Sequence, residues 1–175
     1  MKRFAEFETP RLRLRLTDYE DAAFLLELLN TPKWLQYIGD RNVYDLDSAR
    51  VYIQNRVQSQ YDRLGFAGYT LIRKSDQQKL GCCGLYNREG LEGIDLGFAL
   101  LPQYEGQGYG SEAAGRLKEA AFAEIGLPSL CAITTKDNLA SQGLLRKLGF
   151  QFDQITQLPD DPTPLLYLTL NAPDP

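Results

Sequence analysis

A glycine-rich turn places the strongest constraint on the fold of this chain. Gly106, Gly108 and Gly110 stand at alternate positions between an apolar run at 94–101 and a segment at 111–125 that is rich in alanine, glutamate, leucine and lysine. The first segment is typical of a strand and the second of a helix. Glycine lets the backbone adopt conformations closed to other residues and lets a ligand approach the main chain. Because the first amides of a helix are free and its dipole favours negative charge, the turn predicts a site for an anion such as a pyrophosphate.

Two nucleotide-binding motifs are the first candidates for this turn. No glycine-rich run ends in Lys-Ser or Lys-Thr, which excludes the P-loop of NTPases. The segment from Gly108 to Ala113 fits the G-x-G-x-x-A dinucleotide fingerprint, and Asp137 lies downstream at a distance that suits a ribose-binding acid. That fingerprint normally follows the first strand of a repeating βαβ series, whereas here more than half of the chain precedes it. A nucleotide-dependent oxidoreductase stays open as the less favoured alternative.

The same turn resembles the acyl-CoA loop of the GNAT N-acetyltransferases, Q/R-x-x-G-x-G/A at the end of a central strand. Residues Glu105 to Gly110 fit this pattern, except that glutamate replaces its first residue. A second frame, Gln103 to Gly108, fits the letters as well, but we prefer the first because it keeps the loop beside the start of the helix. The resemblance continues in Asn-Leu-Ala-Ser at 138–141 and Arg-Lys-Leu-Gly-Phe at 146–150.

Two further motifs are similar to one GNAT subgroup, the ribosomal-protein alanine N-acetyltransferases (RimJ/RimL). They are Thr-Pro-Arg-Leu at 9–12 and Gly-Phe-Ala-Leu at 97–100. The resemblance implies a single α/β domain over 1–175, with about 171–175 as a frayed tail, and a mixed, mostly antiparallel sheet with a splayed parallel strand pair, flanked by helices. It also implies acetyl-CoA as cosubstrate and transfer of its acetyl group to a primary amine. The acceptor would be a protein N-terminal amine or a small amine.

The resemblance assigns binding roles to particular residues. The pantetheine arm would hydrogen-bond to the exposed main chain of the central strand, whose Phe98 amide would also be the oxyanion donor. The predicted cofactor-binding residues are Phe98, Ala99, Leu100, Gly106, Gln107, Gly108, Tyr109, Gly110, Ser111 and Asn138. Residues 33–44 would line the acceptor groove, with Trp34 and Tyr37 as substrate-binding residues. Packing beneath a loop is the alternative interpretation of this region.

Acetyl transfer to an amine also needs a proton acceptor and a partner for the departing thiolate. Asp95 on the central strand is the first candidate for the acceptor and Glu92 the second, although Asp95 could equally be a polar residue on the outer face of a half-buried strand. Many relatives use a tyrosine on the last helix as the acid, and Leu145 holds that position here. We predict that Ser141, one turn earlier on the same face, takes this role, while Asn138 and Ser141 also suit ordinary helix capping.

A non-catalytic CoA-binding or CoA-sensing module is the other open class. Such a protein would keep the glycine loop and lose the proton-transfer groups. The missing tyrosine and the unusual Glu105 favour it. A measurement of acetyl-CoA turnover with an amine distinguishes such a module from an enzyme.

Composition limits the remaining classes. The 175 residues are 43% hydrophobic, which is enough for one domain with a real core. The formal net charge of −4 disfavours nucleic acid as a partner and favours a cationic acceptor such as an amine. Without histidine the chain offers no Cys-His acyl-enzyme, which favours direct attack on the thioester, and no zinc site.

Cysteine usage and hydropathy bear on the compartment. Three cysteines make no disulfide framework, and we expect Cys82, Cys83 and Cys131 to be small buried hydrophobes. The sequence shows no signal peptide and no apolar stretch of membrane length. We therefore expect a cytoplasmic protein, a monomer or homodimer, with no membrane partner.

The remaining patterns predict the elements around the turn. Residues 11–16 alternate and indicate a strand with one apolar face and one arginine face, whose arginines we interpret as solvated. Thr17 and Asp47 are the predicted N-caps of the first two helices. Three strands form an antiparallel meander before the turn, and 129–135 is reached by a crossover and runs parallel to the central strand. Strands are predicted at 11–16, 66–73, 79–86, 92–101, 129–135, 151–157 and 165–170, and helices at 17–29, 45–63, 111–125 and 137–148.

Overall fold

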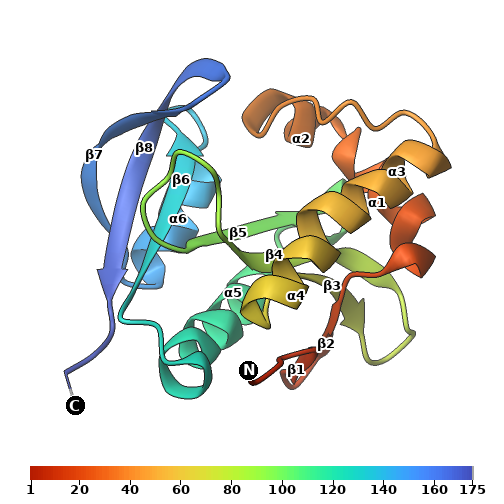
Figure 1. Ribbon diagram of the computed structural model, residues 1–175, viewed down its shortest axis with the longest axis horizontal. Coiled ribbons are helices and arrows are strands. Elements are labelled where there is room, and N and C mark those ends of the chain that lie inside the picture. Colours follow the sequence, from red (N-terminus) through yellow and green to blue (C-terminus); the bar gives the residue numbers. More distant parts are fainter. Residues whose placement is uncertain (175) are drawn as a thin grey trace.

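A computed structural model describes residues 1–174 and shows one eight-stranded sheet with helices on both faces (Figure 1). The strand order is β1-β2-β3-β4-β5-β6-β8-β7. The strands are β1 (Glu6–Glu8), β2 (Leu12–Leu16), β3 (Gly68–Arg73), β4 (Lys79–Tyr86), β5 (Asp95–Leu100), β6 (Ser129–Thr135), β7 (Gln151–Leu158) and β8 (Asp161–Asn171). The helices are α1 (Ala22–Leu29), α2 (Pro32–Tyr37), α3 (Leu46–Ile53), α4 (Ser59–Leu64), α5 (Tyr109–Ala120) and α6 (Leu139–Lys147).

The parallel pair β5 and β6 opens directly after its first residues. The strands pair only at Asp95 opposite Cys131, where the Cys131 amide donates to the Ile94 carbonyl at 2.9 Å. Beyond that point β5 follows β4 and β6 follows β8, both antiparallel, so the two strands separate (Figure 1). Over the described residues, the edge of β5 from Leu96 onward therefore has no strand partner on the β6 side. The predicted mixed sheet with a splayed parallel pair is confirmed.

Two apolar cores cover the two faces of this sheet. On one face, α5 presents buried Ala113 and Leu117 to the strands because its small and apolar residues recur at helical spacing. On the other face, α1 and α3 bury Leu28 and Ile53 beside the buried Trp34. The sheet is therefore fixed on both sides, and the opening between β5 and β6 remains where neither helical layer closes it.

Both predicted N-caps of the first helices are wrong. The first helical segment, a 3₁₀ turn over Tyr19–Asp21 that continues into α1, is capped by Asp18. Thr17 is instead buried and shares a 2.9 Å hydrogen bond with Thr70. At α3 the cap is Asp45, which accepts from the Ser48 amide at 2.7 Å. In both places a carboxylate one or two residues from the predicted cap accepts the free amides.

Other differences concern short or interrupted elements. The sequence shows no pattern for β1, and no helix is predicted within 33–44, whereas α2 occupies Pro32–Tyr37. A π-helical segment over Gln54–Gln58 interrupts the second helix, and another over Ala121–Ile125 ends the α5 helix. The tail expected at 171–175 begins later, because Asn171 belongs to β8, and Pro175 lies outside the described residues.

Candidate active site

The glycine turn forms an open cradle at the start of α5. Gly106 and Gly108 have φ angles of +71° and +82°, in the left-handed region that favours glycine, and Gly108 is the N-cap of α5. A Cβ on Gly106 would meet nothing within 4 Å. Gly110 already lies in the first turn, so the preferred motif frame overlaps the helix start and the alternative frame ends at its cap. Gly106, Gln107 and Gly108 are exposed and their amides form no backbone hydrogen bond among the described residues, which suits an anionic ligand.

A polar network from the N-terminal strands supports the cradle. The carboxylate of Glu112 accepts from the Thr9 hydroxyl at 2.6 Å, and from the Arg11 amide and Nε at 3.0 and 2.7 Å. Arg11 also donates to the Gln107 carbonyl at 3.1 Å and lies 4.3 Å from the centre of the Tyr109 ring. Burial alone would raise the pKa of Glu112, but these hydrogen bonds hold it below its usual value. Through these contacts the network holds the backbone of the glycine turn in place.

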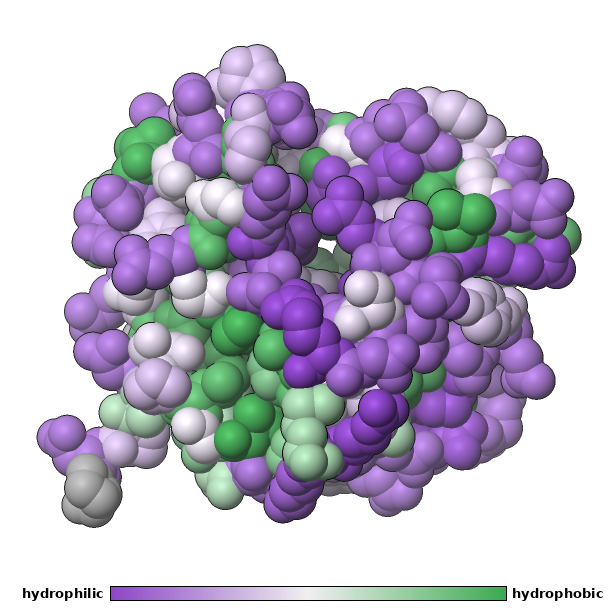
Figure 2. Space-filling model, viewed as in Figure 1, coloured by the Kyte–Doolittle hydropathy of each residue, from purple (hydrophilic) through white to green (hydrophobic). Residues whose placement is uncertain are grey.

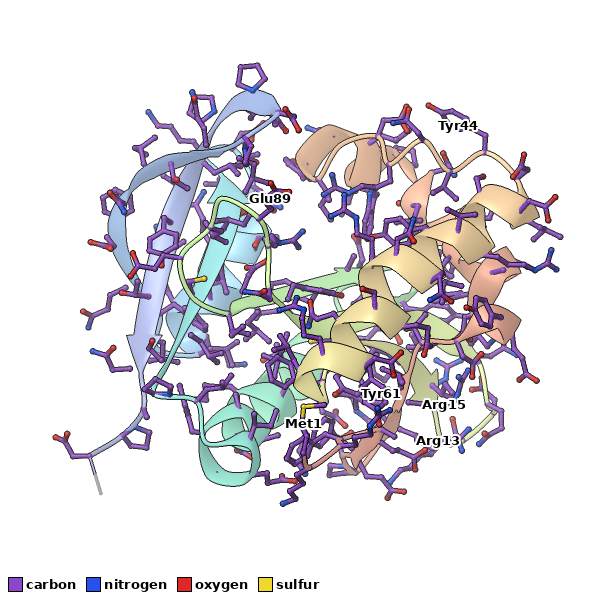
Figure 3. The ribbon with its side chains drawn as sticks, viewed as in Figure 1. Met1, Arg13, Arg15, Tyr44, Tyr61 and Glu89 are labelled. Carbon is purple, nitrogen blue, oxygen red and sulfur yellow. The ribbon has the colours of Figure 1, made fainter. Side chains whose placement is uncertain are left out.

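The arginine face of β2 is therefore not simply solvated, which corrects the expectation. Arg11 belongs to the network just described, and Arg15 pairs with Asp18 and Asp21 at 2.5 and 2.8 Å. Arg13 is half-buried and lies 4.0 Å from Glu6 (Figure 3). The Thr-Pro-Arg-Leu motif drew attention to Thr9 and Arg11 in the sequence, but their partner Glu112 could not be identified from the sequence.

The notch between β5 and β6 leads from this cradle along β5. Phe98, Ala99 and Leu100 are half-buried and pair with β4 on one side, while their other edge faces the opening. A Cβ on Gly110 would lie 3.4 Å from Leu144 of α6 and 3.7 Å from Leu100. The start of α5, the end of β5 and α6 therefore meet at one end of the notch.

Asn138 and Ser141 lie at the N-terminus of α6, after β6. The Asn138 side chain accepts from the Ser141 amide at 3.2 Å and caps the helix. Leu145, at the position where relatives carry a tyrosine, is a core residue with 1% exposure. Ser141 is half-buried and precedes Leu144 by three residues, which places it on the side of α6 that meets the cradle. Its hydroxyl forms no hydrogen bond within residues 1–174.

Asp95 lies at the first residue of β5, at the closed end of the notch. It is 1% exposed, and its Oδ2 accepts from Arg88 Nε at 2.5 Å. Its Oδ1 is buried and has no hydrogen-bond partner among the described residues. Asp95 is therefore not a polar residue on an outer, half-buried face. Glu92 is exposed in the preceding loop, where its carbonyl accepts from the Tyr167 hydroxyl at 2.8 Å.

The two aromatic residues of α2 differ in their surroundings. Trp34 is buried in the core under α1 and α3, and its Nε1 has no partner among the described residues. Tyr37 is half-buried. Between α2 and the cradle, Lys33 forms an ion pair with Glu105, the residue that departs from the GNAT pattern. This pair connects the helix of the predicted acceptor side to the donor loop, which the sequence did not reveal.

The cysteines have no nucleophilic role in this geometry. Cys82, Cys83 and Cys131 are free and buried, as expected. Burial raises the pKa of Cys82 and of Cys131 to about 12 each, so the thiols keep their protons near neutral pH. Within residues 1–174 no cluster of three or more potential metal ligands is present, and no helix has the length and apolarity to span a bilayer.

Comparison with known proteins agrees with this architecture. Residues 11–151 match the family model described as "Acetyltransferase (GNAT) domain". The uncharacterized N-acetyltransferase YoaA of Bacillus subtilis (strain 168) is 26% identical over 149 residues, which cover 85% of this chain and 84% of YoaA. An acetyltransferase structure from Agrobacterium tumefaciens str. C58 has a TM-score of 0.81 at 22% identity, covering 98% of this chain and 96% of that one. The ribosomal-protein-S5-alanine acetyltransferase of Vibrio fischeri has a TM-score of 0.80 at 16% identity, covering 98% of each chain.

The dinucleotide alternative fails on topology. Its fingerprint requires a series of parallel strands joined by helices, but the only parallel pair among the described strands is β5 with β6. Within the match from Gly108 to Ala113, Gly110 lies where α5 approaches Leu100 of β5 and Leu144 of α6.

Proposed function

The chain belongs to the GNAT acetyltransferase family, whose members transfer an acetyl group from acetyl-CoA to an amine, and from this premise we propose that its acceptor is a protein N-terminal amine. One observation carries the donor half of the proposal. It is the bare, left-handed turn of Gly106 and Gly108 at the N-terminus of α5, directly beside the unpaired edge of β5. The turn offers amides to a pyrophosphate, and Phe98, Ala99 and Leu100 offer main-chain partners to the pantetheine amides.

Three groups of the chain fit the chemical steps. The buried Oδ1 of Asp95, which lacks a partner, suits an acceptor for the amine proton, directly or through water. A main-chain amide of the open β5 edge, with Phe98 as the candidate, suits the developing oxyanion. The Ser141 hydroxyl suits the departing thiolate, because it lies on the side of α6 that faces the cradle and is not engaged by the described residues. The proposed order is direct attack of the amine on the thioester.

The N-terminal acceptor is supported by likeness. The Vibrio fischeri protein that shares the fold is described as acting on an alanine of a ribosomal protein. The motifs at 9–12 and 97–100 are similar to those of the same subgroup. These similarities set the first acceptors to test.

The direct test measures release of free thiol from acetyl-CoA with a panel of peptides and small amines. Mass spectrometry of the products then locates the acetyl group on the N-terminal nitrogen or on a lysine side chain. We expect turnover with peptides that begin with a small residue and acetylation at the α-amine. Tight CoA binding without turnover on any amine would identify a non-catalytic module instead.

Ser141→Ala tests the proposed thiolate partner. If the hydroxyl acts only as the thiolate departs, the substitution lowers kcat and leaves the KM for acetyl-CoA nearly unchanged. Loss of a general acid costs about 10²- to 10⁴-fold, and a hydroxyl that only donates a hydrogen bond should fall at or below the lower end of that range. Ser59→Ala, on the exposed start of α4, is the matched control. An unchanged kcat in Ser141→Ala would leave the serine with a structural role at the helix start.

A further inference from the structure

Three arginines come from segments that border the space between the helical side and the β6–β8 side (Figure 1). They are Arg41 in the loop after α2, Arg56 in the π-helical segment after α3, and Arg88 in the loop between β4 and β5. Arg88 lies 5.0 Å from the centre of the Tyr86 ring, and Tyr52 packs against the same apolar cluster as Ala99 of β5 and Val43, two residues after Arg41. Burial lowers the pKa of Arg41, and the positive charges of Arg88 and Arg56 lower it further, which agrees with this placement. Tyr52 of α3 lies among them, and burial raises its pKa, so it keeps a proton to donate.

Acidic partners do not balance this charge. Arg88 is paired with the buried Asp95. Arg41 is half-buried, yet it forms no ion pair and no hydrogen bond with residues 1–174. Arg56 is exposed and likewise forms none. Asp161, at the β7–β8 turn, acts on Arg41 only from a distance, and its carboxylate accepts from the Thr163 amide at 2.9 Å. A partly buried cation without a partner is costly, and an arginine fork matches a carboxylate in shape and charge.

The cluster is distinct from the donor cradle. Arg88 is held at Asp95, the first residue of β5, whereas the glycine turn follows the last residue, Leu100. At the usual rise of a strand these ends lie about 17 Å apart. Figure 2 shows a hollow lined by hydrophilic residues between the helical side and the β6–β8 side, and Figure 3 places exposed Glu89 at its rim, on the loop that carries Arg88. An anion in this hollow is not the pyrophosphate.

We propose that this arginine cluster binds an anionic group of the acceptor, so that the preferred acceptor is an amine that carries a carboxylate. Arg41, with Arg56 and the Tyr52 hydroxyl, would hold the carboxylate while the amine reaches the open edge of β5. The proposal rests on acetyl transfer and specifies the acceptor. The carboxylate could belong to an acidic side chain near a peptide N-terminus or be the α-carboxylate of a free amino acid, and the experiment separates these sources.

The experiment compares acceptors that differ only in charge. Short peptides of one sequence begin with alanine and carry glutamate, glutamine or lysine at the second position, and alanine is compared with alaninamide. For the wild type we expect kcat/KM to be about 10- to 100-fold higher for the acidic member of a pair than for its amide. A peptide pair that shows this ratio identifies a side-chain carboxylate. If only the comparison of alanine with alaninamide shows this ratio, the arginine cluster still binds a carboxylate, and the acceptor is a free amino acid.

Substitutions test whether the arginine cluster causes the ratio of kcat/KM between acidic and neutral acceptors. Arg41→Gln should bring the ratio close to one, chiefly through KM, and Arg56→Gln should reduce it. Arg13→Gln changes a half-buried arginine on β2, away from the notch, and should leave the ratio unchanged. Calorimetric CoA binding checks that each variant is folded. An equal kcat/KM for acidic and neutral acceptors in the wild type overturns the inference. A ratio that stays undiminished in both Arg41→Gln and Arg56→Gln also overturns it. In either case the proposed acetyl transfer is unaffected. Absence of turnover on every amine overturns the proposed function itself.

Discussion

Gly108→Val is expected to lower the affinity for CoA by at least ~100-fold, because two or more charge-assisted hydrogen bonds to the loop backbone are lost. The φ angle of Gly108 is +82°, a conformation that valine adopts only under strain, and a Cβ there would lie 3.3 Å from the Arg11 guanidinium. The loop must therefore move or lose its contact with Arg11. Isothermal titration of CoA into the purified variant measures the effect.

Gly126→Val supplies a control with matched strain. Gly126 has a φ angle of +83° at the C-terminal cap of the α5 helix, and a Cβ there would meet nothing within 4 Å. Both variants should lose about 1–3 kcal/mol of unfolding free energy from backbone strain, but only Gly108→Val should lose CoA binding. Equal affinities for CoA in a folded Gly108→Val variant and the wild type would disprove the proposed cradle.

Asp95→Asn is expected to have the largest combined effect on stability and turnover. The substitution leaves the Arg88 guanidinium without its buried carboxylate, and breaking such a pair costs about 3–5 kcal/mol, with the low end expected because Arg88 is 30% exposed. If Oδ1 also accepts the amine proton, turnover falls at neutral pH and recovers above about pH 8, where a free α-amine is already deprotonated. Chemical denaturation and a pH-rate profile measure the two effects separately.

Arg88→Met distinguishes the structural role of Asp95 from the chemical one. It removes the same ion pair but keeps the carboxylate. If Asp95 serves only to hold Arg88, both variants lose similar stability and share the wild-type pH-rate profile. If Asp95 is the proton acceptor, Asp95→Asn loses activity at neutral pH and recovers it at high pH, whereas Arg88→Met keeps the carboxylate and retains activity at neutral pH. A wild-type profile in Asp95→Asn would leave Glu92 or solvent as the acceptor.

Local patterns predicted most of the sheet. The bounds predicted for 79–86 and 129–135 coincide with β4 and β6, since each is an apolar run bounded by turn-forming residues. β1 has only three residues, of which Phe7 alone is buried, so it carries no period that a sequence can reveal. The caps failed for a related reason, since Thr17 suited a cap by its position but its hydroxyl is used by Thr70, far along the chain.

The candidate site shows the same contrast between features set by local sequence and features set by distant residues. The glycine turn is a continuous segment, two of whose glycines have left-handed backbone angles, so its place at the start of α5 could be predicted from the sequence. The residues that support it or face it come from distant segments: Arg11 meets Glu112 across 101 positions, and Lys33 meets Glu105 across 72. Such pairs depend on the order of strands in the sheet. The net charge of −4 likewise gave no hint that arginines gather beside the notch.

In the proposed assignment of the two substrate sites, the ion pair between Lys33 and Glu105 links one site to the other. Glu105 belongs to the loop that cradles the donor, and Lys33 to the helix that carries Trp34 and Tyr37. Any acceptor that shifts α2 must then alter the affinity for acetyl-CoA, and thermodynamic reciprocity requires acetyl-CoA to alter acceptor affinity by the same factor. Because Lys33 is 58% exposed, this coupling amounts to no more than about 1 kcal/mol and fades as salt screens the pair. The coupling between the binding of the two substrates therefore depends on the ionic strength of the buffer as well as on the protein.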